Sequence, residues 1–325
     1  MEKLSPGYNH IGYFTIVITN TYSNKRLDLL LSEVINNLSR TRIKKLVDTG
    51  FVLLNGAKTE PSHITRTGEI VEVNIPELED FSLKPKKLDL NLIYEDENLL
   101  VINKRANLVM HPGNGNHENT ILNGLLYQYP ESRKLPRAGI VHRLDKDTTG
   151  LVVVAKDQLS YVSLTEQILK KSVKRCYVAL VWGELQKEIE VKRRIERDRV
   201  NRLRFRVSQR ENGRFAHTSV SPVEFGRLEG KRVTLVECVL HTGRTHQIRV
   251  HMEDIGHPIV GDNLYKRGSP RPSRPMVISR QALHAFSLSF MHPANEKDMT
   301  FTASLPPDLK NQINEARICH YPSSK

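Results

Sequence analysis

The sequence predicts an α+β chain of two domains, a small α/β domain followed by a larger domain with a sheet at its core. Two observations support this fold class. Short apolar runs rich in β-branched residues recur along most of the chain, with only a few stretches at helical spacing between them. A polar connector with two prolines, residues 76–87, separates the two parts. The predicted boundaries are 24–80 for the first domain, 88–308 for the second and 309–325 for a polar, loosely packed tail.

The first domain is predicted to hold two short helices and a small sheet. Five apolar residues at helical spacing predict the first helix, namely Leu27, Leu30, Leu31, Val34 and Leu38. Ser39 offers an N-cap for a second helix, which Gly50 closes. Strands are predicted at residues 51–54 and 69–73, and the Asn-Gly pair at 55–56 is a hairpin signal.

In the second domain, strand signals dominate from Leu88 onward. Strands are predicted at residues 92–94, 99–103, 140–141, 151–155, 176–182, 233–240 and 287–291. Two helices are predicted at residues 120–127 and 159–170. The sequence contains no internal repeat and no low-complexity tract, so a single sheet-centred core is the simplest arrangement.

Length and composition fit a protein that buries sizeable cores. The chain has 325 residues, of which 38% are hydrophobic and 26% charged, and this length suits two domains. It contains no apolar run of about 18 residues and no start typical of a signal peptide. We therefore expect a cytoplasmic monomer without a membrane partner. Three cysteines without CxxC spacing agree with free thiols in a reducing compartment.

Charge is the most informative property of the composition. Forty-nine Lys and Arg against 36 Asp and Glu give a formal net charge of +13. This excess points to a polyanionic partner, most simply nucleic acid. Between Lys192 and Arg214 the chain has ten basic and three acidic residues. We interpret this stretch, with Arg202, Arg204 and Arg206 in it, as a phosphate-contacting surface.

One loop of the second domain has the densest set of polar and charged residues. It has the sequence HRLDKDTTG at positions 142–150 and carries two carboxylates, Asp145 and Asp147. The apolar runs on both sides, residues 138–141 and 151–155, would pin it to the sheet. Loops held by rigid strands often carry chemistry. For the tetrapeptide HRLD alone, an exposed turn with an Arg–Asp pair is the alternative interpretation.

The full string HRLDKDTTGLVVVAK, residues 142–156, resembles the signature of the RluA/RluD-type pseudouridine synthases. Other segments also resemble motifs of this family, namely KRCYVALVWG at 174–183, HTGRTHQIRVHM at 241–252, GHPIVGD at 256–262 and shorter ones at 102–104, 109–113 and 281–285. The likeness spans nearly all of residues 88–305. It implies the pseudouridine synthase fold, an α+β domain with a mixed, mainly antiparallel sheet.

The resemblance implies an enzyme that isomerises uridines of large-subunit (23S) ribosomal RNA, free or in a pre-ribosomal particle, to pseudouridine. In that reaction the base is detached from C1′ of its ribose, turned over and rejoined through C5. Nothing is oxidised and no group is carried in, so no cofactor is expected. The sequence agrees, since it has no glycine-rich phosphate loop and no metal-ligand string.

The resemblance also implies roles for individual residues. Asp145 matches the catalytic aspartate and Arg249 the arginine that pairs with it, since a nearby cation keeps a partly buried carboxylate charged. Tyr177 matches the active-site tyrosine, which can stack on the uracil. Arg143 matches a residue that occupies the space left by the flipped base. Ile248 matches an apolar contact beside that base.

The first domain resembles the S4 RNA-binding domain over its whole length. The matching segments are RLDLLL at 26–31, SRTRIKKLV at 39–47 and GFVLLNG at 50–56. This likeness implies that basic residues of the second helix contact structured RNA, namely Arg40, Arg42, Lys44 and Lys45. The alternative interpretation is an ordinary solvent-exposed helix surface.

Three other functions compete with this interpretation. The same chemistry on transfer RNA or another RNA stays open, as does a catalytically silent RNA-binding ribosome-assembly factor. A metal-dependent hydrolase built on His241, His246 and His251 is disfavoured, because a five-residue spacing on a helix turns successive rings by about 500°. No metal site is predicted; instead Thr245 is expected to cap a short packed helix.

The sequence departs from the family pattern at two positions. Arg105 follows Lys104 where the family usually has proline, and the usual proline after Arg197 is missing. Both departures concern loop shape and the choice of RNA rather than the three motifs that carry Asp145, Tyr177 and Arg249.

Overall fold

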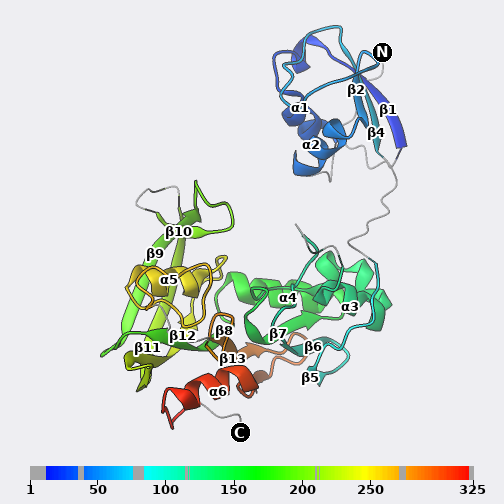
Figure 1. The fold of residues 1–325 in the computed structure, drawn as a ribbon. Helices are drawn as coiled ribbons and strands as arrows, with labels where there is room; N and C mark the ends of the chain where they lie inside the picture. Colours follow the sequence, from blue (N-terminus) through cyan, green and yellow to red (C-terminus); the bar gives the residue numbers. More distant parts are fainter. Residues whose placement is uncertain are drawn as a thin grey trace. The chain divides into compact units, whose positions relative to one another are not determined.

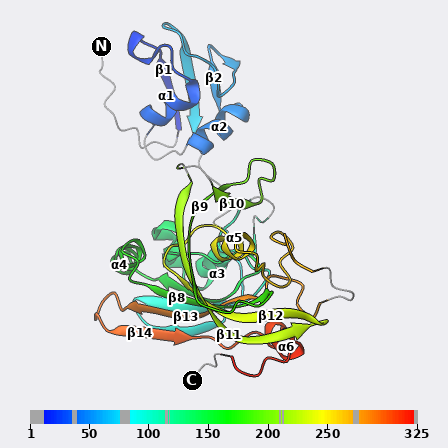
Figure 2. The same cartoon turned by 90° about the vertical axis from the view of Figure 1, so that its left-hand side faces the viewer.

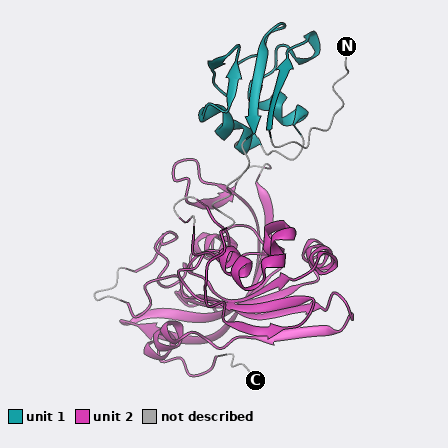
Figure 3. Cartoon of the chain, turned by 90° about the vertical axis from the view of Figure 1, so that its right-hand side faces the viewer, with its two compact units in different colours: residues 1–80 teal, residues 81–325 magenta. Residues whose placement is uncertain are grey.

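The computed structural model describes residues 12–35, 40–75, 84–113, 116, 118–208, 211, 213–270 and 276–321. These residues form two compact units, one within residues 1–80 and one within residues 81–325 (Figure 3). None of the described helices has both the length and the apolar character needed to cross a membrane. Leu38 and Ser39, expected to extend the first helix and to cap the second, lie outside the described residues.

The first unit combines two helices with a four-stranded antiparallel sheet of order β1-β4-β2-β3. Its elements are β1 (Gly12–Val17), α1 (Leu27–Val34), α2 (Arg40–Asp48), β2 (Val52–Leu54), β3 (Ala57–Lys58) and β4 (Ile70–Ile75). Strand β1 lies before the predicted domain start at residue 24, which is therefore corrected. Sequence reasoning missed it because it is an edge strand with exposed Tyr13 and Val17.

The turn chemistry of the first unit follows its sequence closely. Gly50 follows α2 with φ +82°, a left-handed conformation in which helices commonly end. Asn55 and Gly56 both have positive φ and join β2 to β3, as expected for a two-residue hairpin turn. The predicted helices and hairpin are thus confirmed.

The second unit is built on a ten-stranded sheet (Figures 1 and 2). Its strands are β5 (Leu92–Glu95), β6 (Leu99–Lys104), β7 (Thr149–Ala155), β8 (Lys174–Trp182), β9 (Ile189–Arg197), β10 (Phe205–Ser208), β11 (Arg214–Leu228), β12 (Lys231–Leu240), β13 (Leu283–Met291) and β14 (Asp298–Thr302). The order is β10-β9-β11-β12-β8-β13-β7-β6-β5, with β14 beside β13. Among the described strands only β7 and β13 pair in parallel, so the mixed, mainly antiparallel sheet is confirmed.

Helices pack against this sheet and explain its apolar strands. They are α3 (Ile121–Gln128), α4 (Gln158–Leu169), α5 (Gln247–Asp254) and α6 (Pro307–Glu315). In β6, Leu100 and Ile102 join the core that contains Leu125 of α3, whereas Leu99 joins a second core with Leu164 of α4. Alternate residues therefore enter cores on opposite faces, which is why β6 and β7 have continuous apolar runs.

Two predictions for the second domain are wrong. Ile140 and Val141 do not form a strand: a short 3-10 helix, Pro136–Gly139, precedes Ile140, which makes a single bridge to Val154. The C-terminal residues are not a loose tail, because α6 and the residues after it bury apolar side chains in the main core, namely Leu309, Ile313, Ala316 and Ile318. The polar composition of this segment suggested a tail, because its apolar residues are few; their regular spacing is typical of a helix with one buried face.

Candidate active site

The loop at residues 142–148 leads directly into β7, and the fold fixes its path at both ends. Buried Leu144 anchors its first half, and the amide of Thr148 donates to the carbonyl of Asp145 at 3.2 Å. Gly150 has φ +114°, and a Cβ there would lie 2.2 Å from the carbonyl oxygen of Ala285 in β13. Only glycine fits at this point, where β7 and β13 pair closely.

Two buried basic side chains donate hydrogen bonds to backbone carbonyls of this loop. The ammonium group of Lys104 donates to the carbonyls of Lys146 at 2.9 Å and Leu108 at 2.8 Å. Nη1 of Arg280 donates to the carbonyl of Asp147 at 2.9 Å. Burial lowers the pKa of Lys104 to about 7, although the nearby carboxylates oppose the shift. Sequence reasoning gave Lys104 no role; its motif, INK at 102–104, was the available signal.

The structure brings Asp145 and Arg249 together, as the resemblance implied. Nη1 of Arg249 donates to Oδ2 of Asp145 at 3.1 Å. The other side of the guanidinium forms a bidentate pair with Asp262, Nε to Oδ2 at 2.7 Å and Nη2 to Oδ1 at 2.9 Å. The fully buried Asp262 carboxylate also accepts the amides of Leu264 and Tyr265. Arg249 is thus fixed from behind and presents one nitrogen to Asp145.

Electrostatics keep Arg249 charged inside the protein. Burial alone would lower its pKa, but the hydrogen bonds and charge of Asp262, and then those of Asp145, raise it above its usual value. Sequence reasoning quoted the segment that ends in Asp262 but gave this residue no role. Its role as the bidentate partner of Arg249 became evident only from the contact between Asp262 and α5.

Asp145 lies at a cavity of about 630 Å³ in the second unit. It is the one carboxylate among the described residues that line this cavity; Asp147 does not line it. The same lining includes six cations, namely Arg137, Arg143, Lys171, Arg175, Arg244 and Arg249. A single carboxylate among cations suits a polyanionic ligand and makes Asp145 the candidate for the reactive acid.

Three more of the predicted residues line the same cavity. Tyr177 lies in β8 and is buried, which raises the pKa of its hydroxyl to about 12, so the phenol stays protonated at neutral pH. Ile248 is buried on α5, and Arg143 is exposed on the loop of Asp145. The structure therefore gathers Asp145, Arg249, Tyr177, Ile248 and Arg143 at one place; their roles stay predictions.

Three of the basic residues predicted to contact phosphate, Arg202, Arg204 and Arg206, lie elsewhere, on the hairpin of β9 and β10. Arg202 is exposed in the connecting loop. Arg204 immediately precedes β10 and Arg206 lies within it, but both pair with carboxylates, Arg204 with Glu253 at 2.7 Å and Arg206 with Glu196 at 2.9 Å. Part of the predicted positive charge is thus compensated within the protein.

In the first unit the predicted basic residues lie on α2. Arg40 donates to Asp28 of α1 at 2.8 Å, so it also holds the two helices together. Lys44 and Lys45 are exposed, and Arg42 is half-buried. Lys44 and Lys45 are therefore the residues of this helix best placed to meet a ligand.

The histidines examined for a metal site have separate surroundings. His246 precedes α5 and, rather than Thr245, occupies its N-cap position. Its Nδ1 contacts the hydroxyl of Tyr265 at 2.8 Å, whereas Nδ1 of His251 contacts Thr218 at 2.9 Å. These rings do not converge on a common point.

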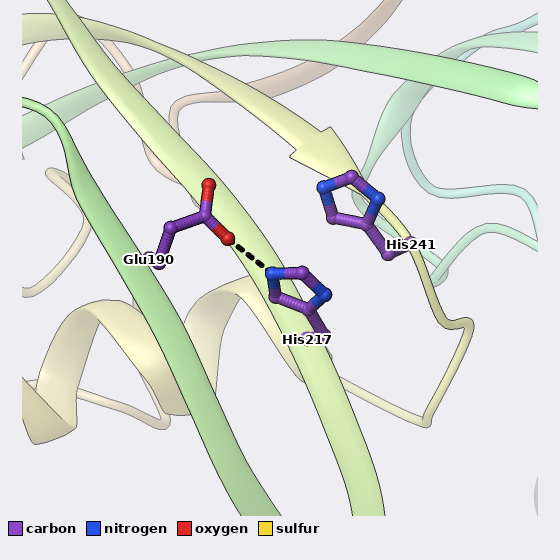
Figure 4. Close-up of side chains that lie close together, drawn as sticks. All are labelled: Glu190, His217 and His241. Atoms are coloured by element: carbon purple, nitrogen blue, oxygen red, sulfur yellow. Dashed lines mark hydrogen bonds and ion pairs between the residues drawn. The ribbon is translucent and has the colours of Figure 1, made fainter.

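A different cluster, Glu190, His217 and His241, has ligand atoms within 4.8 Å of one another (Figure 4). Nε2 of His217 pairs with Glu190, and Nε2 of His241 contacts the hydroxyl of Ser219 at 2.7 Å. The two imidazoles stack, with centroids 4.1 Å apart and planes inclined by 16°. Imidazole binds a metal in the plane of its ring, so nearly parallel stacked rings cannot share an ion in this arrangement. We assign no metal to the cluster.

Comparison with known proteins agrees with this geometry. Residues 98–254 match the model of a family described as RNA pseudouridylate synthase. The ribosomal large subunit pseudouridine synthase D of Nitrosomonas europaea is 40% identical over 93% of this chain and 87% of that protein. The protein of the same name from Escherichia coli O6:H1 is 39% identical over 93% of this chain and 94% of its own length. The solved human RNA Pseudouridylate Synthase Domain Containing 1 has a TM-score of 0.54 and 25% identity, and covers 76% of this chain and 100% of its own.

Proposed function

Because this chain belongs to the RNA pseudouridylate synthase family and is an RNA pseudouridine synthase, we propose that its substrates are uridines of large-subunit ribosomal RNA. The relatives that match it over most of its length are named for the large ribosomal subunit. Its net charge of +13 agrees with a large polyanionic partner. Free RNA and a pre-ribosomal particle both supply such a partner. We propose that the enzyme acts on this target as a cytoplasmic monomer, because all the residues to which we assign a role below belong to one chain.

The observation that carries the proposed chemistry is the lone carboxylate of the cavity. Moving uracil from N1 to C5 attachment requires the glycosidic bond to break and a new carbon–carbon bond to form, without net oxidation. Asp145, held by Arg249 at 3.1 Å, is the carboxylate that the described residues place at this cavity. The protonated hydroxyl of Tyr177 and the apolar side chain of Ile248 supply a surface for the base. No bound cofactor is needed for this chemistry.

The target base must leave its stack before it can reach Asp145. The exposed Arg143 directly precedes the buried Leu144 and lines the same cavity. We assign it the space that the flipped uridine leaves in the RNA. The other cavity cations, such as Arg137 and Arg244, would neutralise phosphates beside the flipped nucleotide.

The test of this function is Asp145→Asn, which removes the charge with little change in volume. Single-turnover release of tritium from RNA carrying 5-tritiated uridine is expected to be abolished, while the Kd for RNA stays within about threefold. Asp147→Asn is the matched control, because this carboxylate lies in the same loop but outside the cavity lining. More than a few per cent of residual activity in Asp145→Asn would rule out its catalytic role.

The RNA itself is identified by mapping pseudouridine in cells with and without the gene. Loss of pseudouridine from large-subunit ribosomal RNA is the expected result. Loss confined to transfer RNA would keep the chemistry and replace the target, whereas no change in any RNA would favour a silent assembly factor.

We further propose that the first unit is an S4-like RNA-binding domain that contacts RNA through α2. Replacing Lys44 and Lys45 with glutamine should weaken RNA binding by about three- to tenfold, while the single-turnover rate at saturating enzyme stays unchanged. Lys25→Gln is the matched control, because Lys25 is already paired with Glu33 at 2.6 Å. Equal affinity of the double variant and the wild type would contradict an RNA-binding role for α2.

A further inference from the structure

We propose that His246 is a positioning residue for Asp145 and that Tyr265 decides which ring nitrogen carries its proton. The inference rests on the proposed role of Asp145 in uridine isomerisation. His246 lines the cavity, and its Nε2 lies 3.9 Å from Oδ2 of Asp145. Oδ2 is also the oxygen that binds Arg249. Among the described residues both contacts of the carboxylate fall on Oδ2, which leaves Oδ1 for the substrate.

The hydrogen bonds of Tyr265 determine the tautomer of His246. Its hydroxyl oxygen accepts the backbone amide of Phe205, the first residue of β10, at 2.7 Å. Nδ1 of His246 lies 2.8 Å from the same oxygen. Because Tyr265 is fully buried, its own proton needs an acceptor, and Nδ1 is the acceptor within reach. Nδ1 therefore keeps its lone pair, and the neutral ring carries its proton on Nε2.

The surroundings favour this neutral ring. Burial lowers the pKa of His246 below its usual value. The carboxylates of Asp145 and Asp262 oppose the shift. The guanidiniums of Arg249 and Arg143 add to it. A second proton on Nδ1 would also leave the hydroxyl of Tyr265 without an acceptor.

The consequence is an N–H donor directed toward the reactive carboxylate. At 3.9 Å the Nε2–H of His246 orients Asp145 through its dipole, and a small approach on substrate binding would complete a hydrogen bond. The opposite tautomer would place a lone pair beside the carboxylate and repel it. Asp145 would then leave the position in which Oδ1 faces the substrate.

The backbone supports a specific use of this side chain. His246 has φ 56° and ψ 22°, a left-handed conformation that is unfavourable for residues with a Cβ. Glycine would begin α5 with less strain. Its ring also packs edge-on against Phe205 and Tyr265, so the strained backbone and the aromatic contacts together aim one nitrogen at the cavity.

The first experiment measures single-turnover tritium release by the full chain on ribosomal RNA with 5-tritiated uridine. His246→Leu is expected to lower the rate about 10- to 100-fold and to change the Kd for RNA less than about threefold. His246→Gln, whose amide can supply a donor in the place of Nε2–H, is expected to recover most of the rate. A rate for His246→Leu equal to that of the wild type would overturn the proposal.

The second experiment tests the tautomer by its dependence on pH. Tyr265→Phe removes only the hydroxyl, so the neutral ring can carry its proton on either nitrogen and the rate should fall severalfold at pH 8. As the pH falls toward the lowered pKa of His246, a growing fraction of the ring is doubly protonated, which restores Nε2–H, and the ratio of wild-type to variant rate should shrink. A ratio that stays constant with pH would overturn the role of Tyr265.

Controls separate this proposal from the proposed function and from unfolding. Tyr129→Phe also removes one hydroxyl bond, to Glu95 at 2.9 Å, but lies outside the cavity lining and should behave like the wild type. A wild-type chain that forms no pseudouridine would refute the proposed function itself. An active wild type matched by His246→Leu and Tyr265→Phe would refute only the positioning. If His246→Leu fails to show a cooperative thermal transition, His246→Gln and Tyr265→Phe decide.

Discussion

The loop that holds Asp145 and the hairpin of β9 and β10 are both rich in charge. The basic side chains of the two regions differ in their burial and in the groups that they bind. Beneath the loop, Lys104 and Arg280 are buried and bind backbone carbonyls. On the hairpin, Arg206 pairs with Glu196 while 46% of its side chain stays exposed. At its tip Val200 is 96% exposed.

The contrast agrees with the two different tasks that we propose for these regions. A reacting carboxylate must stay within a fraction of an ångström of its place, and buried, fully bonded cations supply that precision at a cost in desolvation. A surface that meets phosphates gains from charges that can adjust, and exposed ion pairs contribute little stability. The two regions should therefore respond differently to the loss of one cation.

The largest effect is expected for Arg249→Ala. Asp145 would lose its cation and Asp262, fully buried, would lose its bidentate partner. The single-turnover rate should fall at least about 100-fold, and the free energy of unfolding by about 3–5 kcal/mol because a buried carboxylate is left unpaired.

Arg249→Lys provides the matched comparison, since it keeps the charge but cannot reproduce the bidentate pair with Asp262 together with the bond to Asp145. Its rate should lie between those of the wild type and Arg249→Ala. A rate loss in Arg249→Ala of only a few fold, in a chain of unchanged stability, would show that the loop does not depend on this pair.

The same contrast explains what could be predicted from the sequence. Apolar runs and apolar periodicity predicted β6, β7 and α3, because these depend on neighbours along the chain. In the structure Thr120 caps α3 through Asn123, which is also a contact between near neighbours. The supports of the site depend on contacts between distant segments. Lys104 reaches Lys146, and Arg249 reaches Asp145, 104 positions away. Only the resemblance suggested the second contact, and nothing suggested that Asp262 lies behind it.

A smaller, pH-dependent effect is expected for the buried cation beneath the loop. Burial lowers the pKa of Lys104 to about 7, whereas an unfolded lysine titrates near 10.4. Between these values the unfolded chain binds more protons, so this residue makes the wild type more stable as pH rises. Compared with Lys104→Met, the free energy of unfolding of the wild type should increase by up to about 1.4 kcal/mol per pH unit.

Urea denaturation at pH 7, 8 and 9 measures this difference. At every pH, Lys104→Met should also lower the single-turnover rate, because the carbonyls of Leu108 and Lys146 lose their donor. A stability difference independent of pH would mean that Lys104 keeps its proton throughout, with its three carbonyl bonds outweighing the burial.

The smallest effect is expected on the hairpin, where a single exposed arginine is removed. Arg202→Gln should weaken binding by a few fold, equally for target and non-target RNA, because phosphate contacts carry no direct sequence information. It should flatten the plot of log K against log salt by about 0.7 if it contacts one phosphate of single-stranded RNA.

Arg206→Gln should flatten the slope less, because Glu196 already offsets its charge at 2.9 Å. Replacing Arg202, Arg204 and Arg206 together should change the slope by no more than about 2. A wild-type slope in Arg202→Gln, or a loss of affinity confined to the cognate RNA, would show that the hairpin is not a phosphate-contacting surface. The charged residues of the hairpin would then differ from those of the Asp145 loop only in burial.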